Sequence, residues 1–291
     1  MKKFLLWFRI VRPQTLFASL VPVLVGVISV WHAHTPVQVA NPFAVASVTA
    51  ICALGLQILS NLINDYYDFV RGSDKAGRAG FKRALAEGEV SSRQMLTAIC
   101  VDFAVVAVSG LCLVFSGGIP ILLIGGSAIL FAWLYTATSH SLSYLGIADI
   151  FVFLYYGVIA SAGTAYLLTH SFVSTSFHAG AVCGLISMCV LMINNLRDIE
   201  DDRAAGKRTL PVRFGKHTAE LLMLLEVLLM PVFACLAFGI SLPMLILVPA
   251  LYIFTLVIKA RGQEYNKYLL FTGLSNVVYL FLCLLMLLLK I

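Results

Sequence analysis

Apolar residues fill this chain in runs of about 20, separated by short polar segments. A run of that length lets an α-helix cross a hydrocarbon core of roughly 30 Å. Nine runs predict nine transmembrane helices, at about 14–31, 43–63, 94–115, 119–136, 144–168, 178–196, 217–239, 242–259 and 268–289. We therefore expect an all-α, polytopic membrane bundle that forms a single domain over residues 1–291.

The composition supports a membrane protein. Of the 291 residues, 60% are hydrophobic and only 12% are charged, and the mean hydropathy is +0.96. A soluble domain carries roughly 25% charged residues. The seven cysteines are scattered through the apolar runs without a CxxC pair, so we interpret them as small core residues and expect neither disulfides nor a thiolate metal site.

The basic residues test the number of helices independently. Nineteen of the 20 Lys and Arg residues fall in four clusters: the N-terminus, 71–93, 197–216 and 259–267. Cytoplasmic loops of membrane proteins are enriched in Lys and Arg, and nine helices with a cytoplasmic N-terminus place all four clusters on that side. The net charge of +6 then reflects topology and contact with anionic lipid headgroups, and no nucleic-acid partner is expected.

Two polar stretches close the second and the sixth apolar runs. The first contains Asn61, Asn64, Asp65 and Asp68, and the second, 133 residues later, contains Asn194, Asp198, Asp201 and Asp202. On a helix, the members of each set share one face because they are spaced by three, four or seven residues. Hard cations such as Mg²⁺ prefer carboxylate and amide oxygens and often bridge them to a phosphate or diphosphate. The two faces therefore predict a divalent-metal site at the cytoplasmic edge.

Basic loops follow both motifs directly, at about 69–93 and 197–216. A basic cytoplasmic loop commonly reflects topology alone. Next to an acidic helix end, however, guanidinium and ammonium groups can bind the diphosphate oxygens that the metal does not take. This arrangement suggests an enzyme that removes diphosphate from a membrane-buried allylic lipid, after which an electron-rich acceptor captures the cation.

Two further ionisable residues lie near or inside the apolar runs. Arg12 opens the first run, where it either reaches the headgroups or points inward at an anionic ligand. Asp149 lies inside the fifth run, and an intramembrane carboxylate is a functional candidate by default.

The motifs Asn64-x3-Asp68 and Asp198-x3-Asp202 resemble the paired metal-binding motifs of the UbiA superfamily of intramembrane prenyltransferases. Three further segments, Arg12–Thr15, Tyr144–Phe153 and Asn194–Thr209, are similar to the branch that acts on 1,4-dihydroxy-2-naphthoate in menaquinone biosynthesis. The resemblance covers about residues 12–215, and the last three predicted helices carry no motif. It implies a central cavity that opens sideways to lipid.

The resemblance also implies roles for individual residues. The expected Mg²⁺ ligands, direct or through diphosphate, are Asn64, Asp65, Asp68, Asp198 and Asp202, and the four acids among them are the expected catalytic residues. The expected diphosphate contacts are Lys82, Arg83, Arg197, Lys207 and Arg208, with Tyr135 near the prenyl cleft. Arg12, Asn61, Asp149 and Asn194 complete the expected substrate-binding set through their positions in the chain.

The expected reaction is transfer of a polyprenyl group from its diphosphate to a ring carbon of a dihydroxynaphthoate. Diphosphate is released, and the carboxylate is lost by decarboxylation if it occupies that carbon. We expect a multi-pass protein of the bacterial inner membrane whose active site faces the cytoplasm. The general base stays open among Asp65, Asp74 and Asp149. The acceptor also stays open, because residues 137–141 depart from the Gly-Gly-Pro-type turn of the naphthoate enzymes; 4-hydroxybenzoate, homogentisate or another acceptor is the alternative.

A cation-coupled transporter is the alternative from another functional class. Such transporters also show repeated halves with intramembrane acids. Their ion sites lie near the bilayer midplane, whereas both acidic motifs here lie at one membrane edge and continue into basic loops. The positions of the motifs therefore favour the enzyme.

Overall fold

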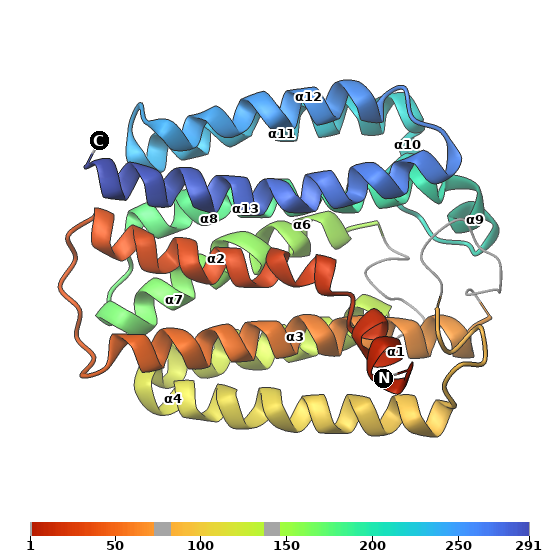
Figure 1. Ribbon diagram of the computed structural model, residues 1–291, viewed down its shortest axis with the longest axis horizontal. Coiled ribbons are helices and arrows are strands. Elements are labelled where there is room, and N and C mark those ends of the chain that lie inside the picture. Colours follow the sequence, from red (N-terminus) through yellow and green to blue (C-terminus); the bar gives the residue numbers. More distant parts are fainter. Residues whose placement is uncertain (1, 73–82, 137–145, 291) are drawn as a thin grey trace.

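The computed structural model describes residues 2–72, 83–136 and 146–290, and over these residues the chain is helical and contains no strand. Figure 1 shows the long helices side by side in one elongated bundle. The helices of the first half are α1 (Lys2–Val11), α2 (Pro13–His32), α3 (Pro42–Val70) and α4 (Ser92–Thr136). A broken helix follows, made of α6 (Ala148–Phe153), the π-helical turn η1 (Leu154–Val158) and α7 (Ile159–Thr169).

The second half begins with α8 (Ser174–Arg197), two short helices and α11 (Lys216–Phe238). The short helices are α9 (Ile199–Ala204) and α10 (Leu210–Phe214). The chain ends with the 3₁₀ turn η2 (Leu242–Ile246), α12 (Leu247–Val257), the turn η3 (Gly262–Glu264) and α13 (Tyr265–Leu289).

Seven helices of the described chain are long and apolar enough to cross a membrane, and the segment Leu242–Val257 is a shorter apolar helix. One of the seven, α4, is interrupted at Gly118, whose φ of 65° and ψ of −151° are not helical. Glycine tolerates this conformation because it has no Cβ. The chain reverses direction there, between the predicted helices 94–115 and 119–136 (Figure 1).

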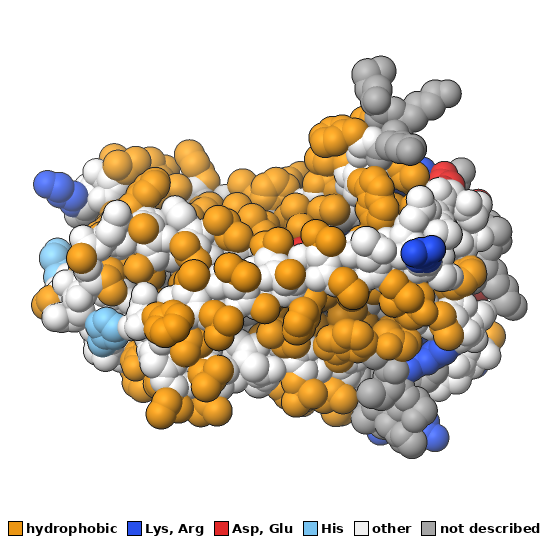
Figure 2. Space-filling model, turned by 90° about the horizontal axis from the view of Figure 1, so that it is seen from below, with side chains coloured by type: hydrophobic (Ala, Val, Ile, Leu, Met, Phe, Trp, Pro, Cys, Tyr) orange, Lys and Arg blue, Asp and Glu red, His pale blue; other side chains and the backbone are white. Residues whose placement is uncertain are grey.

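The polar connections lie at one end of the bundle. Figure 1 shows α1, α9, α10 and the connection from α3 to α4 at that end, and the connections from α2 to α3 and from α7 to α8 at the other. The two chain termini lie at opposite ends (Figure 1). In Figure 2 the Lys and Arg side chains gather mainly at the polar end, while hydrophobic side chains cover the middle of this face.

The interior contains two large hydrophobic clusters. One joins α3 and α4 with Ile10 of α1 and Leu167 of α7. The other joins α2, α8, α11, α12 and α13. Many large apolar side chains outside these clusters are exposed, including Phe115 at 91% and Val248 at 65%. A surface of this kind matches lipid contact and not water contact.

Helix α8 and the π-helical turn η1 approach each other closely at glycine residues. A Cβ added to Gly157 would lie only 2.5 Å from the backbone oxygen of Gly180 and from the backbone nitrogen of Gly184. Small residues permit such close helix contact inside a membrane. The crossing fixes the position of the aromatic residues that flank Gly157.

Candidate functional site

The first polar motif lies on the last three turns of α3. This helix runs to Val70, two turns past the predicted end at 63, so it carries the whole motif. Asn61, Asp65 and Asp68 are buried, with exposed fractions of 8%, 3% and 3%. Their spacing places them on one face of the helix, as the sequence predicted.

Asp65 forms ion pairs with two arginines. Its Oδ1 accepts a hydrogen bond from Arg12, which lies at the junction of α1 and α2. The same oxygen accepts another from Arg83, the first residue of the described range 83–136. Arg12 adopts a left-handed backbone conformation, with φ 56° and ψ 67°, which is uncommon for a residue other than glycine. This turn redirects the chain between α1 and α2. The buried carboxylate thereby holds two cations at the end of α3.

The second motif is not one continuous helix, contrary to the prediction. The helix α8 ends at Arg197, Asp198 leaves helical geometry with φ −101° and ψ 16°, and α9 begins at Ile199. Asp198 and Asp202 are buried, at 4% and 7% exposed. Asp202 lies 3.4 Å from the ammonium nitrogen of Lys207.

Arg197 connects the second motif to the last helix. Its guanidinium donates two hydrogen bonds to the Asp198 carboxylate, at 2.7 and 2.6 Å, one to Asn194 Oδ1 at 2.7 Å and one to Asn266 Oδ1 at 2.7 Å. The side chain is only 3% exposed. The planar fork of the guanidinium thereby orients Asn194 and Asp198. The diphosphate contact that the resemblance implies for Arg197 stays a prediction.

Sequence reasoning missed Asn266, which lies on α13 and lines the cavity described below. The last three predicted helices carried no motif, so a lone Asn at the start of one of them was a weak signal. Its position inside the fourth basic cluster, 259–267, could have identified it.

We expect Arg197→Lys to lower the stability of the folded protein. Lysine keeps the charge but cannot make the four hydrogen bonds of the guanidinium, so buried acceptors lose their donors. The expected loss is about 1–3 kcal/mol in the free energy of unfolding. The apparent Tm of detergent-solubilised protein measures it, and Arg203→Lys, whose ion pair with Glu200 is exposed, is the matched control. An unchanged Tm for Arg197→Lys would contradict this role.

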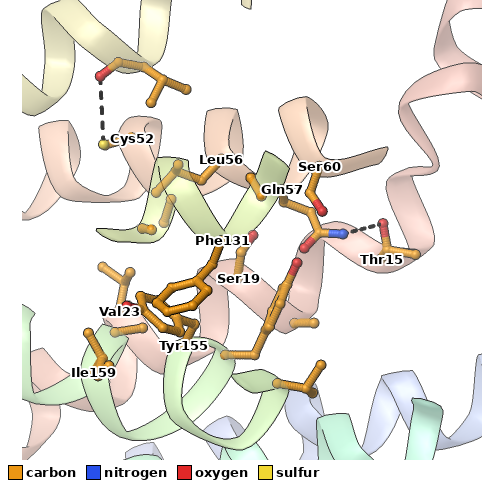
Figure 3. Close-up of a pocket in the computed structure, with 18 of the residues that line it drawn as sticks. Thr15, Ser19, Val23, Cys52, Leu56, Gln57, Ser60, Phe131, Tyr155 and Ile159 are labelled. Carbon is orange, nitrogen blue, oxygen red and sulfur yellow. Dashed lines mark hydrogen bonds between the residues drawn. The ribbon is translucent and has the colours of Figure 1, made fainter. Parts of the chain in front are cut away.

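A cavity of about 930 Å³ lies between the two hydrophobic clusters. Its polar end is formed by six side chains: Arg12, Asn61, Asn64, Arg83, Asn194 and Asn266. Its remaining wall is mostly apolar or small and includes Val23, Leu111, Ile121, Gly125, Gly126 and Leu167. Figure 3 shows part of this wall, with Phe131 and Tyr155 side by side, and the two ring centroids are 5.1 Å apart. The cavity therefore joins a cationic and amide-rich mouth to an apolar chamber.

The residues at the mouth and at the adjoining end of α3 fit a divalent cation shared with a diphosphate. Asn64 Oδ1, in the mouth, and Asp68 Oδ1, one helical turn further along α3 and outside the cavity lining, are buried oxygens without a hydrogen-bond partner in the described chain. The described residues contain no group of three or more acidic, His or Cys side chains close enough to hold a metal alone. A cation that keeps several ligands from water and diphosphate, as Mg²⁺ does, suits such an incomplete set of protein oxygens.

Other expected site residues lie away from the cavity wall or outside the described chain. Asp149 is 5% exposed at the first turn of α6 and does not line the cavity, although Phe151 and Val152 do. Lys207 pairs with Asp202, and Arg208 is exposed. Four expected features fall outside what the structure describes: Lys82, Asp74, the segment 137–141 and the side chain of Tyr135.

Relatives with curated functions match most of the chain. The 1,4-dihydroxy-2-naphthoate octaprenyltransferase of Escherichia coli is 36% identical over 73% of this chain and 70% of its own length. The protein of that name from Mycobacterium leprae is 34% identical over 76% of this chain and 74% of its own length.

Solved structures share the fold. A UbiA homologue from Archaeoglobus fulgidus, determined with DMAPP and Mg²⁺ bound, superposes with a TM-score of 0.68 at 17% identity, over 96% of this chain and 97% of that one. The same homologue with GPP and Mg²⁺ gives a TM-score of 0.69 at 16% identity, over 96% and 98%. The model of the UbiA prenyltransferase family matches residues 19–272. The chain belongs to the UbiA prenyltransferase family.

Proposed function

We propose that this protein transfers a polyprenyl group from polyprenyl diphosphate to a dihydroxynaphthoate and releases diphosphate, as a step of menaquinone biosynthesis. The observation that carries the proposal is the cavity, because one apolar chamber opens at a mouth that carries residues of both polar motifs. A prenyl diphosphate has the same division into an apolar tail and an anionic head. The naphthoate acceptor follows from the relatives that are 33–36% identical to this chain.

The chain's own cations would bind the diphosphate. Arg12 and Arg83 both line the mouth, and Asp65 orients both guanidinium groups. As the bond between the prenyl carbon and oxygen breaks, negative charge develops on the leaving diphosphate. Preorganised guanidinium donors in a site shielded from water stabilise this developing charge more than they stabilise the intact substrate. They therefore lower the barrier to bond cleavage.

The oxygens of Asn64, Asp65, Asp68, Asp198 and Asp202 are the proposed Mg²⁺ ligands, either directly or through diphosphate. When bound, Mg²⁺ would neutralise diphosphate charge and act as a Lewis acid toward the leaving group. Arg197 would keep Asn194 and Asp198 in place. Because the chamber is apolar, it would shield the allylic cation from water until the acceptor captures it.

We further propose nine membrane crossings in one domain over residues 1–291, with the N-terminus and the active site on the cytoplasmic side of a bacterial inner membrane. The break at Gly118 divides α4 into two crossings, and the short apolar helix Leu242–Val257 adds one to the seven long helices. An odd number of crossings agrees with termini at opposite ends of the bundle (Figure 1). The basic clusters at the polar end support the orientation.

Withdrawal of divalent metal tests the proposed chemistry. Purified protein in lipid vesicles receives geranylgeranyl diphosphate and 1,4-dihydroxy-2-naphthoate, with EDTA or with added Mg²⁺. We expect no prenylated product with EDTA, and full recovery when Mg²⁺ is restored, because without the cation the charge that develops on the leaving diphosphate is not neutralised. Transfer that continues at the same rate in EDTA would contradict the proposed role of the metal.

A further inference from the structure

Gln57 places an amide group inside the cavity wall. It lies on α3 four residues before Asn61, which puts it about 6 Å deeper along the helix axis than the polar mouth. Its side chain is part of an apolar chamber, and only 7% of the residue is exposed. A buried amide costs free energy unless its donors and its acceptor are hydrogen-bonded.

The neighbours of Gln57 determine which way its amide faces. Asn61 Nδ2 donates to the backbone oxygen of Val11 at 3.3 Å, and a carbonyl oxygen can only accept. The Asn61 amide is thereby oriented, and its Oδ1 accepts from Gln57 Nε2 at 3.4 Å. Gln57 Nε2 also donates to Thr15 Oγ1 at 3.3 Å. The amide nitrogen of Gln57 is therefore used by protein partners.

The amide oxygen is left over. Gln57 Oε1 is buried and has no hydrogen-bond partner in the part of the chain that the structure describes. Figure 3 shows the nitrogen turned toward Thr15 and the oxygen on the opposite side of the amide. The protein holds this buried acceptor in one orientation without giving it a hydrogen bond. A donor on a bound ligand would complete its hydrogen bonding.

The ligand can be identified from its chemistry, given the proposed function. A prenyl tail carries no O–H or N–H group, and the diphosphate belongs at the mouth with Arg12 and Arg83. The remaining substrate is an aromatic ring with two hydroxyl groups. The Phe131 and Tyr155 rings, also in the cavity wall, offer flat apolar surfaces for such a ring.

We propose that Gln57 Oε1 accepts a hydrogen bond from a ring hydroxyl of the aromatic acceptor, and that Gln57 thereby selects hydroxylated acceptors and positions them below the diphosphate. The protein would then distinguish acceptors at a residue of α3 that belongs to neither acidic motif. An acceptor without that hydroxyl would leave the buried Gln57 oxygen without a hydrogen bond. The free-energy cost of that missing bond would discriminate strongly between acceptors with and without the hydroxyl.

A thermodynamic cycle tests this contact. Wild type and Gln57→Met are compared with 1,4-dihydroxy-2-naphthoate and with its 1-hydroxy and 4-hydroxy counterparts, each of which lacks one hydroxyl. The readout is kcat/KM for each acceptor at saturating geranylgeranyl diphosphate. Loss of a hydroxyl also changes ring reactivity, but that change is common to both proteins and cancels in the cycle. Ser19→Ala is the matched control, because Ser19 lines the same cavity but its hydroxyl already donates to Leu16 O at 3.0 Å.

We expect the preference for the dihydroxy acceptor over one of its counterparts to fall at least about tenfold in Gln57→Met, and to stay at the wild-type value in Ser19→Ala. The KM for geranylgeranyl diphosphate should stay within about twofold of wild type. If Gln57→Met does not fold, Gln57→Asn, which withdraws the oxygen by one methylene group, is expected to lose the same preference. Equal losses for all three acceptors would overturn the inference and leave the proposed function standing. A wild-type protein that prenylates none of the naphthoates would overturn both.

Discussion

Asp68→Asn is expected to reduce prenyl transfer by about a thousandfold or more without unfolding the protein. Asp68 is 3% exposed at the last turn of α3, and its Oδ1 has no partner in the described chain. Asparagine keeps the shape of the side chain but removes the negative charge that attracts a divalent cation. The remaining activity should need a higher Mg²⁺ concentration, which a Mg²⁺ titration of the transfer rate measures.

The control for this prediction is Glu200→Gln. Glu200 is exposed in the stretch that follows Asp198, where it forms a surface ion pair with Arg203. Its replacement removes one negative charge beside the second motif at little cost in stability. If Asp68→Asn retained the wild-type rate and Mg²⁺ dependence, Asp68 would have no part in metal or diphosphate binding.

Gly157→Val is expected to destabilise the protein by at least about 3 kcal/mol or to prevent folding. The new Cβ would meet backbone atoms of Gly180 and Gly184 at 2.5 Å. Backbone atoms in a packed helix cannot move aside as a flexible side chain can, so α8 and the η1 segment would have to separate. The yield of folded protein and its apparent Tm in detergent report the effect.

The same substitution at Gly126 is the control. A Cβ at Gly126 meets nothing within 4 Å, because this glycine faces the open cavity. Gly126→Val should therefore keep the wild-type Tm. Equal Tm values for the two variants would show that the crossing at Gly157 is not tightly packed.

The hydropathy pattern predicted the all-α class because the bilayer demands long apolar segments whose backbone groups bond internally, and seven helices of the described chain are long and apolar enough to cross a membrane. The number of nine crossings stays a prediction. The gap between the predicted helices 94–115 and 119–136 also matches the break that the structure places at Gly118. On α3, helical spacing predicted a shared face for Asn61, Asp65 and Asp68, and this was confirmed. These features depend on neighbours within a few residues in the chain.

The rest depends on contacts between distant residues. Helical spacing predicted one continuous face for the second motif, and this was wrong because α8 ends at Arg197, whose side chain bonds to Asp198 and to Asn266, 69 residues away. Asn266 and Gln57 are single polar residues in apolar helices, and only the packing of the helices reveals that both line one cavity.

Product mass spectrometry tests the central claim most directly. Vesicles that contain the protein receive Mg²⁺ and geranylgeranyl diphosphate, together with 1,4-dihydroxy-2-naphthoate, its 6-carboxy isomer or 4-hydroxybenzoate, and Asp68→Asn serves as the negative control. We expect a prenylated naphthalene product from 1,4-dihydroxy-2-naphthoate, none from 4-hydroxybenzoate, and about a thousandfold less product from the control. A product from 4-hydroxybenzoate alone would contradict the proposed acceptor, and the absence of transfer to any acceptor by folded wild-type protein would contradict the proposed function.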